Sequence, residues 1–145
     1  MQQLEKILAE TGIKVYEHTV AVVGLLEEPL PSVMQKLGNA EGLIGLVFDD
    51  VETTLIITEK GWERVMAKFA SYRVQHGFRL ITLDIALDWS VVGFLAAISG
   101  ELARKGIPVG SISAYSRDHL LVKQEYLERA LDSLKGFLAT FRTRV

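Results

Sequence analysis

The sequence predicts an α+β fold made of two βαββα units, each an antiparallel sheet with its helices on one face. Stretches of alternating or continuous apolar residues, which indicate strands, are followed by stretches with apolar residues three or four positions apart, which indicate helices. The same order of elements occurs twice within the 145 residues, at nearly the same spacing. Because a sheet with one apolar face needs helices to cover it, each copy should form two layers.

The first copy is assigned to residues 1–76. It begins with a short helix over 2–10, whose apolar residues share one face, and continues into residues 13–26, which are rich in β-branched side chains and predict one long strand. The remaining elements are a helix from Pro31 to Leu37, strands at 43–48 and 53–58, and a helix that Thr58 caps, with an apolar stripe of Trp62, Val65, Met66, Phe69 and Tyr72.

The second copy is assigned to residues 77–145 and repeats this order. A strand over 78–87 leads through a tight loop into a helix over 91–105, and strands at 109–115 and 119–122 form a hairpin. A helix over 125–137 follows, and we expect the basic tail at 139–145 to be frayed. A unit of this size is marginally stable alone, so the two copies are expected to pair.

Composition excludes several classes of protein. Hydrophobic residues make up 49% of the chain and charged residues 23%, which is typical of a folded globular protein. The absence of cysteine excludes disulfides and thiolate metal sites, and the net charge of −2 argues against binding nucleic acid or an anionic membrane. No signal peptide or membrane-spanning run is evident, which predicts a cytoplasmic location. The mean hydropathy of +0.24 fits either a well-filled core or apolar surface within an oligomer interface.

The loop between the strand over 78–87 and the next helix is the candidate binding element. A helix that begins near Ser90 or Val91 leaves its first N–H groups unpartnered and carries a positive dipole end, which favours a carboxylate or phosphate. Gly93 has no Cβ, so a ligand or another backbone segment can approach closely there. The structural alternative is that Asp88 or Ser90 only caps the helix and Gly93 only permits packing.

Residues 78–138 resemble an ACT domain, a small regulatory module that binds amino acids, and are most similar to its aspartokinase-like and arginine-sensor branch. The first half of the chain is similar in element order alone, with Glu27-Glu28-Pro29 in the place of Asp88-Trp89-Ser90. The resemblance implies that both units are ferredoxin-like. The stretches that carry it are Leu87-Asp88-Trp89-Ser90-Val91-Val92-Gly93-Phe94-Leu95, Gly106-Ile107-Pro108-Val109 and Ile112-Ser113-Ala114-Tyr115-Ser116-Arg117-Asp118-His119-Leu120-Leu121-Val122.

The resemblance further implies a small amino acid held where ACT units meet. Backbone amides from Ser90 through Val91 and Val92 to Gly93 would take the α-carboxylate, and Trp89 would either cover the ligand or pack under the sheet.

The α-amine would be bound from the opposite strand. Ile112 and Ser113 would offer it backbone groups, and Asp118 lies where the arginine-sensor branch has an Asp that faces its ligand. A carboxylate suits an ammonium or guanidinium, which makes Asp88 a second candidate partner for the amine. The structural alternative for Asp118 is that of a turn residue.

No other motif predicts chemistry. His18, His76 and His119 are scattered singly, which does not predict a metal site, and no serine has the context of a nucleophile. Glycine-rich phosphate motifs are also absent from the sequence. We therefore predict no catalytic residue, no metal and no cofactor.

The resulting hypothesis is a non-enzymatic, tandem ACT-like regulatory or sensor protein. It would bind a small-molecule amino acid at an ACT–ACT interface, form a homodimer and act on a separate protein target. The alternative is a ligand-free structural or protein-interaction module that retains the ACT fold.

Overall fold

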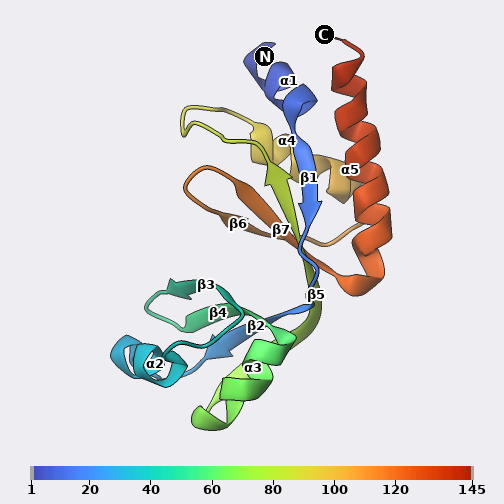
Figure 1. Ribbon diagram of the computed structural model, residues 1–145. Coiled ribbons are helices and arrows are strands. Elements are labelled where there is room, and N and C mark those ends of the chain that lie inside the picture. The colour runs from blue at the N-terminus through green and yellow to red at the C-terminus, as the bar shows by residue number, and fades with distance from the viewer. Residues whose placement is uncertain (1, 145) are drawn as a thin grey trace. The chain divides into compact units, whose positions relative to one another are not determined.

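The computed structural model describes residues 2–144, and their contacts divide the chain into two units (Figure 1). Unit 2 is continuous and comprises His18–Phe78. Unit 1 is discontinuous, because the residues up to Glu17 pack with those from Arg79 onward.

Unit 2 is a four-stranded sheet with its helices packed on one apolar face. Its strands lie in the order β3-β4-β2-β5, and neighbouring strands are antiparallel. Thr58 ends β4 and caps α3, because its hydroxyl oxygen accepts a hydrogen bond from Gly61 N at 3.0 Å. The elements of unit 2 are β2 (Val20–Leu25), α2 (Leu30–Leu37), β3 (Leu43–Phe48), β4 (Thr53–Thr58), α3 (Glu59–Val65), the 3₁₀ turn η1 (Met66–Lys68) and the first part of β5 (Tyr72–Asp84). Its core contains Ala21, Val23, Leu25, Val33, Leu37, Leu55, Ile57, Trp62, Val65 and Phe69.

Unit 1 has the same arrangement, and its sheet runs in the order β1-β5-β7-β6. Its elements are α1 (Gln2–Glu10), β1 (Gly12–Val15), the rest of β5, α4 (Phe94–Arg104), β6 (Gly110–Ser113), β7 (Asp118–Lys123), the 3₁₀ turn η2 (Gln124–Tyr126) and α5 (Leu127–Arg142). Its core is formed by one face of the sheet and the three helices, through Leu8, Ile81, Leu83, Phe94, Ile98, Leu102, Ile107, Leu120, Val122, Leu127, Ala130, Leu134 and Leu138.

The predicted fold class is confirmed. Each unit contains a βαββα series with an antiparallel sheet covered by helices on one face, which is the ferredoxin-like arrangement. The fourth strand of each sheet comes from outside that series. Unit 2 uses the first part of β5, whereas unit 1 uses β1, which pairs antiparallel with β5 from Gly12↔Asp84 to Val15↔Ile81.

Several predicted boundaries were wrong. The strand expected over 13–26 is two strands, β1 and β2, which pair with different partners. The helix expected to reach Tyr72 ends at Lys68, and Tyr72 begins β5. The helix expected from Val91 begins at Phe94. The division into copies at residues 1–76 and 77–145 stays a prediction; by its contacts, unit 2 ends at Phe78 and the residues up to Glu17 pack in unit 1.

The C-terminal tail expected to fray is helical as far as Arg142. The Arg142 guanidinium donates to the carbonyl oxygens of Ala9 at 3.0 Å and Thr11 at 2.8 Å, which ties α5 to the end of α1. Within the described residues, no helix is both long and apolar enough to cross a membrane.

Candidate functional site

The N-terminus of α4 is uncapped by any side chain. Gly93 precedes the helix with a φ of 90°, and the first hydrogen bond inside the helix runs from Ala97 N to Gly93 O at 2.9 Å. The N–H groups from Gly93 to Ala96 therefore have no partner within the helix, and they carry the positive end of its dipole. The φ of Gly93 lies in the left-handed region of backbone conformations, which residues other than glycine rarely adopt.

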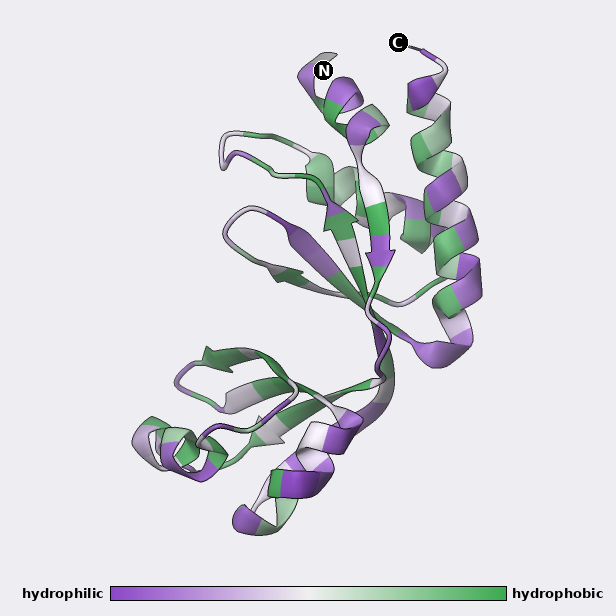
Figure 2. Ribbon diagram, viewed as in Figure 1, coloured by the Kyte–Doolittle hydropathy of each residue, from purple (hydrophilic) through white to green (hydrophobic). Residues whose placement is uncertain are grey.

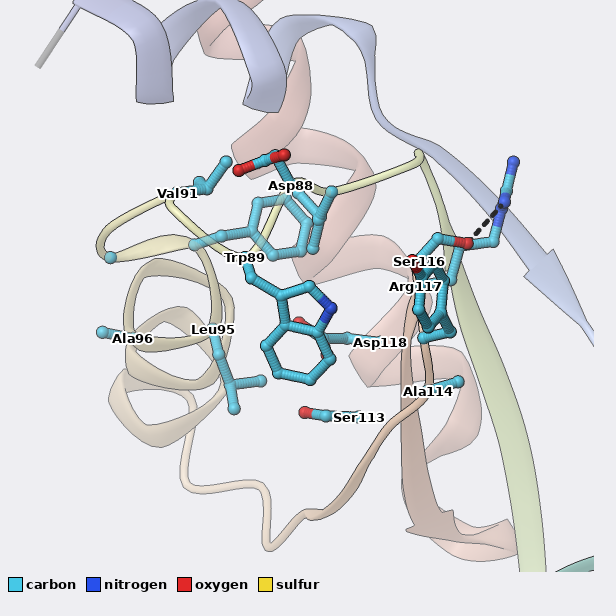
Figure 3. A pocket seen from close by; sticks show the side chains of 14 residues that line it. Asp88, Trp89, Val91, Leu95, Ala96, Ser113, Ala114, Ser116, Arg117 and Asp118 are labelled. Carbon is cyan, nitrogen blue, oxygen red and sulfur yellow. Dashed lines mark hydrogen bonds between the residues drawn. The ribbon is translucent and has the colours of Figure 1, made fainter.

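These N–H groups belong to one wall of a cavity of about 260 Å³ in unit 1 (Figure 3). The opposite wall is the end of β6, the start of β7 and the turn between them. A hydrogen bond of 2.7 Å from Leu87 N to Ser116 O ties the two walls together. The cavity is lined by Leu87, Asp88, Trp89, Val91, Gly93, Phe94, Leu95, Ala96, Ser113, Ala114, Tyr115, Ser116, Arg117 and Asp118.

Asp118 is the buried charged group of this cavity. Only 9% of its surface is exposed, and its side chain points from the start of β7 toward Trp89 (Figure 3). Within residues 2–144 its carboxylate takes part in no hydrogen bond or ion pair. Among the described residues, Arg79 Nε is the one buried side-chain polar atom without a partner, so the Asp118 oxygens reach the open space of the cavity that Asp118 lines. There the carboxylate is available to a ligand.

Arg117, the nearest cation in the sequence, is directed away from Asp118. Its Nε lies 2.9 Å from Asp84 Oδ1, and its Nη1 donates to the Ser116 hydroxyl at 3.2 Å (Figure 3). The Arg117 hydrogen bond, followed by one from Lys14, holds the pKa of Asp84 below its usual value. Asp84 therefore takes the charge that could otherwise have neutralised Asp118.

Asp88 has a local role in shaping the loop. Its carboxylate accepts hydrogen bonds from the Ser90 hydroxyl and from Ser90 N, the latter at 2.9 Å. These two bonds, the hydroxyl first, lower the pKa of Asp88, so it stays ionised. Asp88 lines the cavity, but part of its hydrogen-bonding capacity is already used.

Six of the nine residues proposed from the sequence line the cavity: Asp88, Trp89, Val91, Gly93, Ser113 and Asp118. Ser90 instead turns back to Asp88, and Val92 is 84% exposed. Ile112 pairs with His119, whereas Ser113 pairs with Asp118. Because side chains alternate across a strand, Ile112 and His119 point to the other face of the sheet.

The remaining residues that line the cavity were not among those proposed from the sequence. Leu95 and Ala96 line the cavity because α4 begins at Phe94, after the expected start, and Gly93 was the signal for this. The turn from Ala114 to Arg117 lines it because the Leu87 bond brings the turn against the loop, and no local pattern announces that contact.

Three apolar residues near the cavity are open to solvent. Trp89 is 74% exposed and Tyr115 87%, and both line the cavity; Val92 lies in the same loop. Exposed aromatic groups beside a buried polar group are typical of a surface that another protein segment covers.

The described residues contain no group of three or more side chains suited to hold a metal ion. His119 Nδ1 lies 2.8 Å from the Thr82 hydroxyl, and burial lowers the pKa of His119, which favours the neutral ring. Because this ring faces away from the cavity, it is not placed to exchange protons with a ligand there.

Residues 73–136 match the ACT domain. This match spans the cavity and both of its walls. A comparison with curated proteins found no match.

Solved structures show the same fold over most of the chain. The aspartokinase α and β subunits superpose with a TM-score of 0.72 at 15% identity, over 89% of this chain and 98% of that one. A protein of unknown function from Vibrio cholerae has a TM-score of 0.67 at 23% identity, over 92% and 94%. The ligand-free regulatory subunit of aspartate kinase from Thermus thermophilus has a TM-score of 0.66 at 15% identity, over 88% and 97%. At these identities the likeness establishes the fold.

Proposed function

We propose that this protein is a regulatory protein that binds a small amino acid in the cavity of unit 1. The observation that carries the proposal is a pair of opposite charges in one cavity. The uncapped N-terminus of α4 attracts an anion, and the carboxylate of Asp118, which lines the cavity, attracts a cation. An α-amino acid carries both groups on one carbon, so it can satisfy the two walls together.

In this proposal each wall has a defined role. The N–H groups of Phe94, Leu95 and Ala96 bind the α-carboxylate, and Asp118 binds the α-ammonium. The apolar side chains of the loop and of α4 contact the ligand's side chain. The cavity of about 260 Å³ is close to the lower end of the range for small-molecule sites, which starts at about 300 Å³, and this favours a ligand the size of an amino acid.

The exposed rim supports the interface location. We propose that a second ACT-type unit covers Trp89, Val92 and Tyr115, so that a ligand bridging the two surfaces favours the paired state by its differential affinity. The ACT match and the regulatory subunits among the structural neighbours support a regulatory, non-catalytic role that is exerted on a separate protein. We also keep the proposal that residues 1–76 and 77–145 derive from two copies of one ACT-type unit.

Isothermal titration of the purified protein with each of the twenty amino acids tests the ligand class. We expect a heat of binding with at least one of them and a loss of roughly 10- to 100-fold in affinity for Asp118→Asn, because a hydrogen bond to a charged group contributes about 1.5–3 kcal/mol. Asp50→Asn, in an exposed turn of unit 2, is the matched control and should bind as the wild type does. Absence of heat with all twenty would contradict the proposal.

The exposed rim also fits the alternative of a ligand-free interaction module. In that case Asp118→Asn would leave every interaction unchanged, whereas Trp89→Ala or Tyr115→Ala would abolish partner binding because these side chains carry the exposed apolar area. Pull-down of a partner by the Asp118→Asn and Trp89→Ala proteins separates the two functions.

A further inference from the structure

The two tryptophans of the chain have opposite surroundings. Trp62 is 2% exposed in the core of unit 2, where its ring stacks on Phe69 at 6.0 Å and meets Tyr72 edge-on at 5.0 Å. Trp89, in the loop ahead of α4, is 74% exposed, and within residues 2–144 its ring takes part in no ring stacking, cation–π contact or hydrogen bond. The indole is therefore not packed under the sheet, and its faces are open to a molecule outside the fold.

The loop fixes the point at which this ring is attached. Val91 N donates to Asp88 O at 3.1 Å, which closes a β-turn with Trp89 and Ser90 at its centre. The Asp88 carboxylate tightens the turn further, because it accepts hydrogen bonds from the N–H and the hydroxyl of Ser90. The backbone of Trp89 is thus held beside the cavity that it lines, and its side-chain torsions decide where the indole lies.

Trp89 and Asp118 line the cavity from opposite walls. The Asp118 side chain points toward Trp89 (Figure 3). Arg117, in contrast, is directed away to Asp84. A cation that binds the Asp118 carboxylate therefore comes to lie beside the indole. The face of an aromatic ring carries a negative partial charge, and tryptophan attracts a cation within about 6 Å of its ring more strongly than tyrosine or phenylalanine does.

The ring of Trp89 differs from other rings of the chain in having no cation of its own. Figure 2 shows hydrophobic and hydrophilic residues intermixed along the loop ahead of α4, so the ring is not part of a continuous apolar surface. Within residues 2–144 neither a lysine nor an arginine lies over it. Elsewhere, side chains of the protein occupy such places: Lys36 lies over Phe69, Arg129 over Tyr126 and Arg144 over Phe141.

We propose that the indole of Trp89 holds the ligand's ammonium against the Asp118 carboxylate by a cation–π contact, which makes Trp89 the residue that selects for the amine. This inference rests on the proposed function and adds the class of molecule that the site rejects. A carboxylic acid with the same carbon skeleton but no amine still binds the N-terminus of α4, yet it lacks the charge that Asp118 and Trp89 attract. The cavity thereby distinguishes an amino acid from the α-keto and α-hydroxy acids related to it.

An exposed indole has two faces, and they can serve different molecules. One face contacts the ammonium, while the other stays open to the second unit that we propose covers the rim. Loss of the ring would then weaken pairing as well as ligand binding. Affinity alone does not separate these two contributions, whereas selection for the amine depends only on the contact with the ammonium.

Titration calorimetry of the full-length chain measures this selection. The probes are the amino acid that gives the largest heat among the twenty and the carboxylic acid in which hydrogen replaces its amine, such as propanoate for alanine. The ratio of their dissociation constants is the selectivity for the amine. Trp89→Leu should lower this ratio roughly 2- to 30-fold, which is the range expected for a cation–π contact, and Trp89→Phe should lower it less.

Phe48→Leu is the matched control, because it replaces an aromatic ring that is 56% exposed on β3 of unit 2, outside the cavity. It should keep the wild-type ratio. Fluorescence gives an independent readout, since Trp89 is exposed and Trp62 is buried. The emission of the wild type should change when the amino acid binds, and that of Trp89→Leu, which retains Trp62 alone, should not.

An unchanged ratio in Trp89→Leu, with both affinities lowered equally or not at all, overturns the inference and leaves the proposed function standing. Trp89 would then be an apolar cover or a contact with the second unit. Absence of heat with all twenty amino acids contradicts the proposed function and this inference together. Trp89→Leu should fold as the wild type does by circular dichroism, because the side chain is mostly exposed. If it does not, the ratio measured with Trp89→Phe decides in the same way.

Discussion

The N-termini of α4 in unit 1 and α2 in unit 2 occupy the same place in the two units but differ in how their charge is treated. No side chain caps either helix, and at α4 a cavity opens in front of the helix end. At α2 the preceding Glu28 accepts hydrogen bonds from the Ser32 hydroxyl in the first turn and from Lys36 Nζ, the latter at 2.9 Å. Unit 2 thus supplies its own anion where unit 1 leaves room for one.

The strand opposite each helix differs in the complementary way. β7 begins with Asp118, whereas β4 begins with Thr53, which is buried and neutral. Unit 2 therefore has a carboxylate of its own beside the helix end and none at the start of the opposite strand. The comparison indicates that the fold provides the positions and that a site arises only where the chain leaves both charges uncompensated.

The largest expected effect on ligand binding comes from giving the start of β7 in unit 1 the residue type that begins β4 in unit 2. Asp118→Thr should lower amino-acid affinity roughly 10- to 100-fold, since the ammonium loses its charged partner. The same change should leave the free energy of unfolding within about 0.5 kcal/mol of the wild-type value, because the carboxylate faces the cavity and makes no hydrogen bond within the fold. Titration calorimetry and urea unfolding measure the two effects. A loss of both affinity and stability would instead identify Asp118 as a structural residue.

Gly93→Ala should be the next largest change. A methyl group there would meet Leu4 Cδ2 at 3.3 Å, and the φ of 90° adds a strain of roughly 1–2 kcal/mol. Urea unfolding measures the loss of stability, and titration should show weaker ligand binding because the first turn of α4 moves.

Gly106→Ala is the control for this prediction. Gly106 has a φ of 70° but open space around its Cβ position, so its replacement adds strain without a contact. It should lower stability by a similar amount and leave ligand binding intact. Equal losses of binding in the two variants would show that the contact with Leu4 does not position the loop.

Glu28→Gln tests whether unit 2 satisfies its own helix end. The Ser32 hydrogen bond, followed by that of Lys36, lowers the folded-state pKa of Glu28. A carboxylate with a lowered folded-state pKa stabilises the fold above its unfolded-state pKa and loses that contribution as the pH falls through the folded-state value. The wild type should therefore be more stable than the variant at neutral pH, and unfolding curves should converge in acid. A difference that is independent of pH would exclude this role.

Ser90→Ala should have the smallest effect. Loss of the hydroxyl removes the larger cause of the lowered pKa of Asp88, so that pKa should rise toward its ordinary value while the backbone bond remains. An NMR titration of the Asp88 carboxyl carbon measures the change. Asp84, whose pKa is set by Arg117 and Lys14, should titrate as before, and a shift there would mean that the loop had rearranged.

Local patterns predicted most of the elements. The strands β3 and β4 have the bounds expected from their apolar runs, and Thr58 caps α3 as expected. The wrong boundaries lie where one apolar pattern in the sequence continues although the chain changes the element with which it packs or pairs. Tyr72 keeps the helical spacing of the stripe before it, yet pairs with Leu25 in the sheet. The run from Ile13 to Leu26 reads as one strand because its side chains do not reveal that β1 and β2 have different neighbours.

The sequence by itself determined the βαββα order, the loop ahead of α4 with its glycine, and the presence of an acidic residue at the start of β7. These depend on the conformational preferences of neighbouring residues. Only the tertiary structure decided that β1 completes the sheet of unit 1, because strand pairing joins residues that are distant in the chain. That pairing brings Lys14 to Asp84, where Arg117 also binds, while Asp118 faces the cavity. Which charged side chains pair depends on the distances between them in the folded state, and a local sequence pattern does not contain those distances.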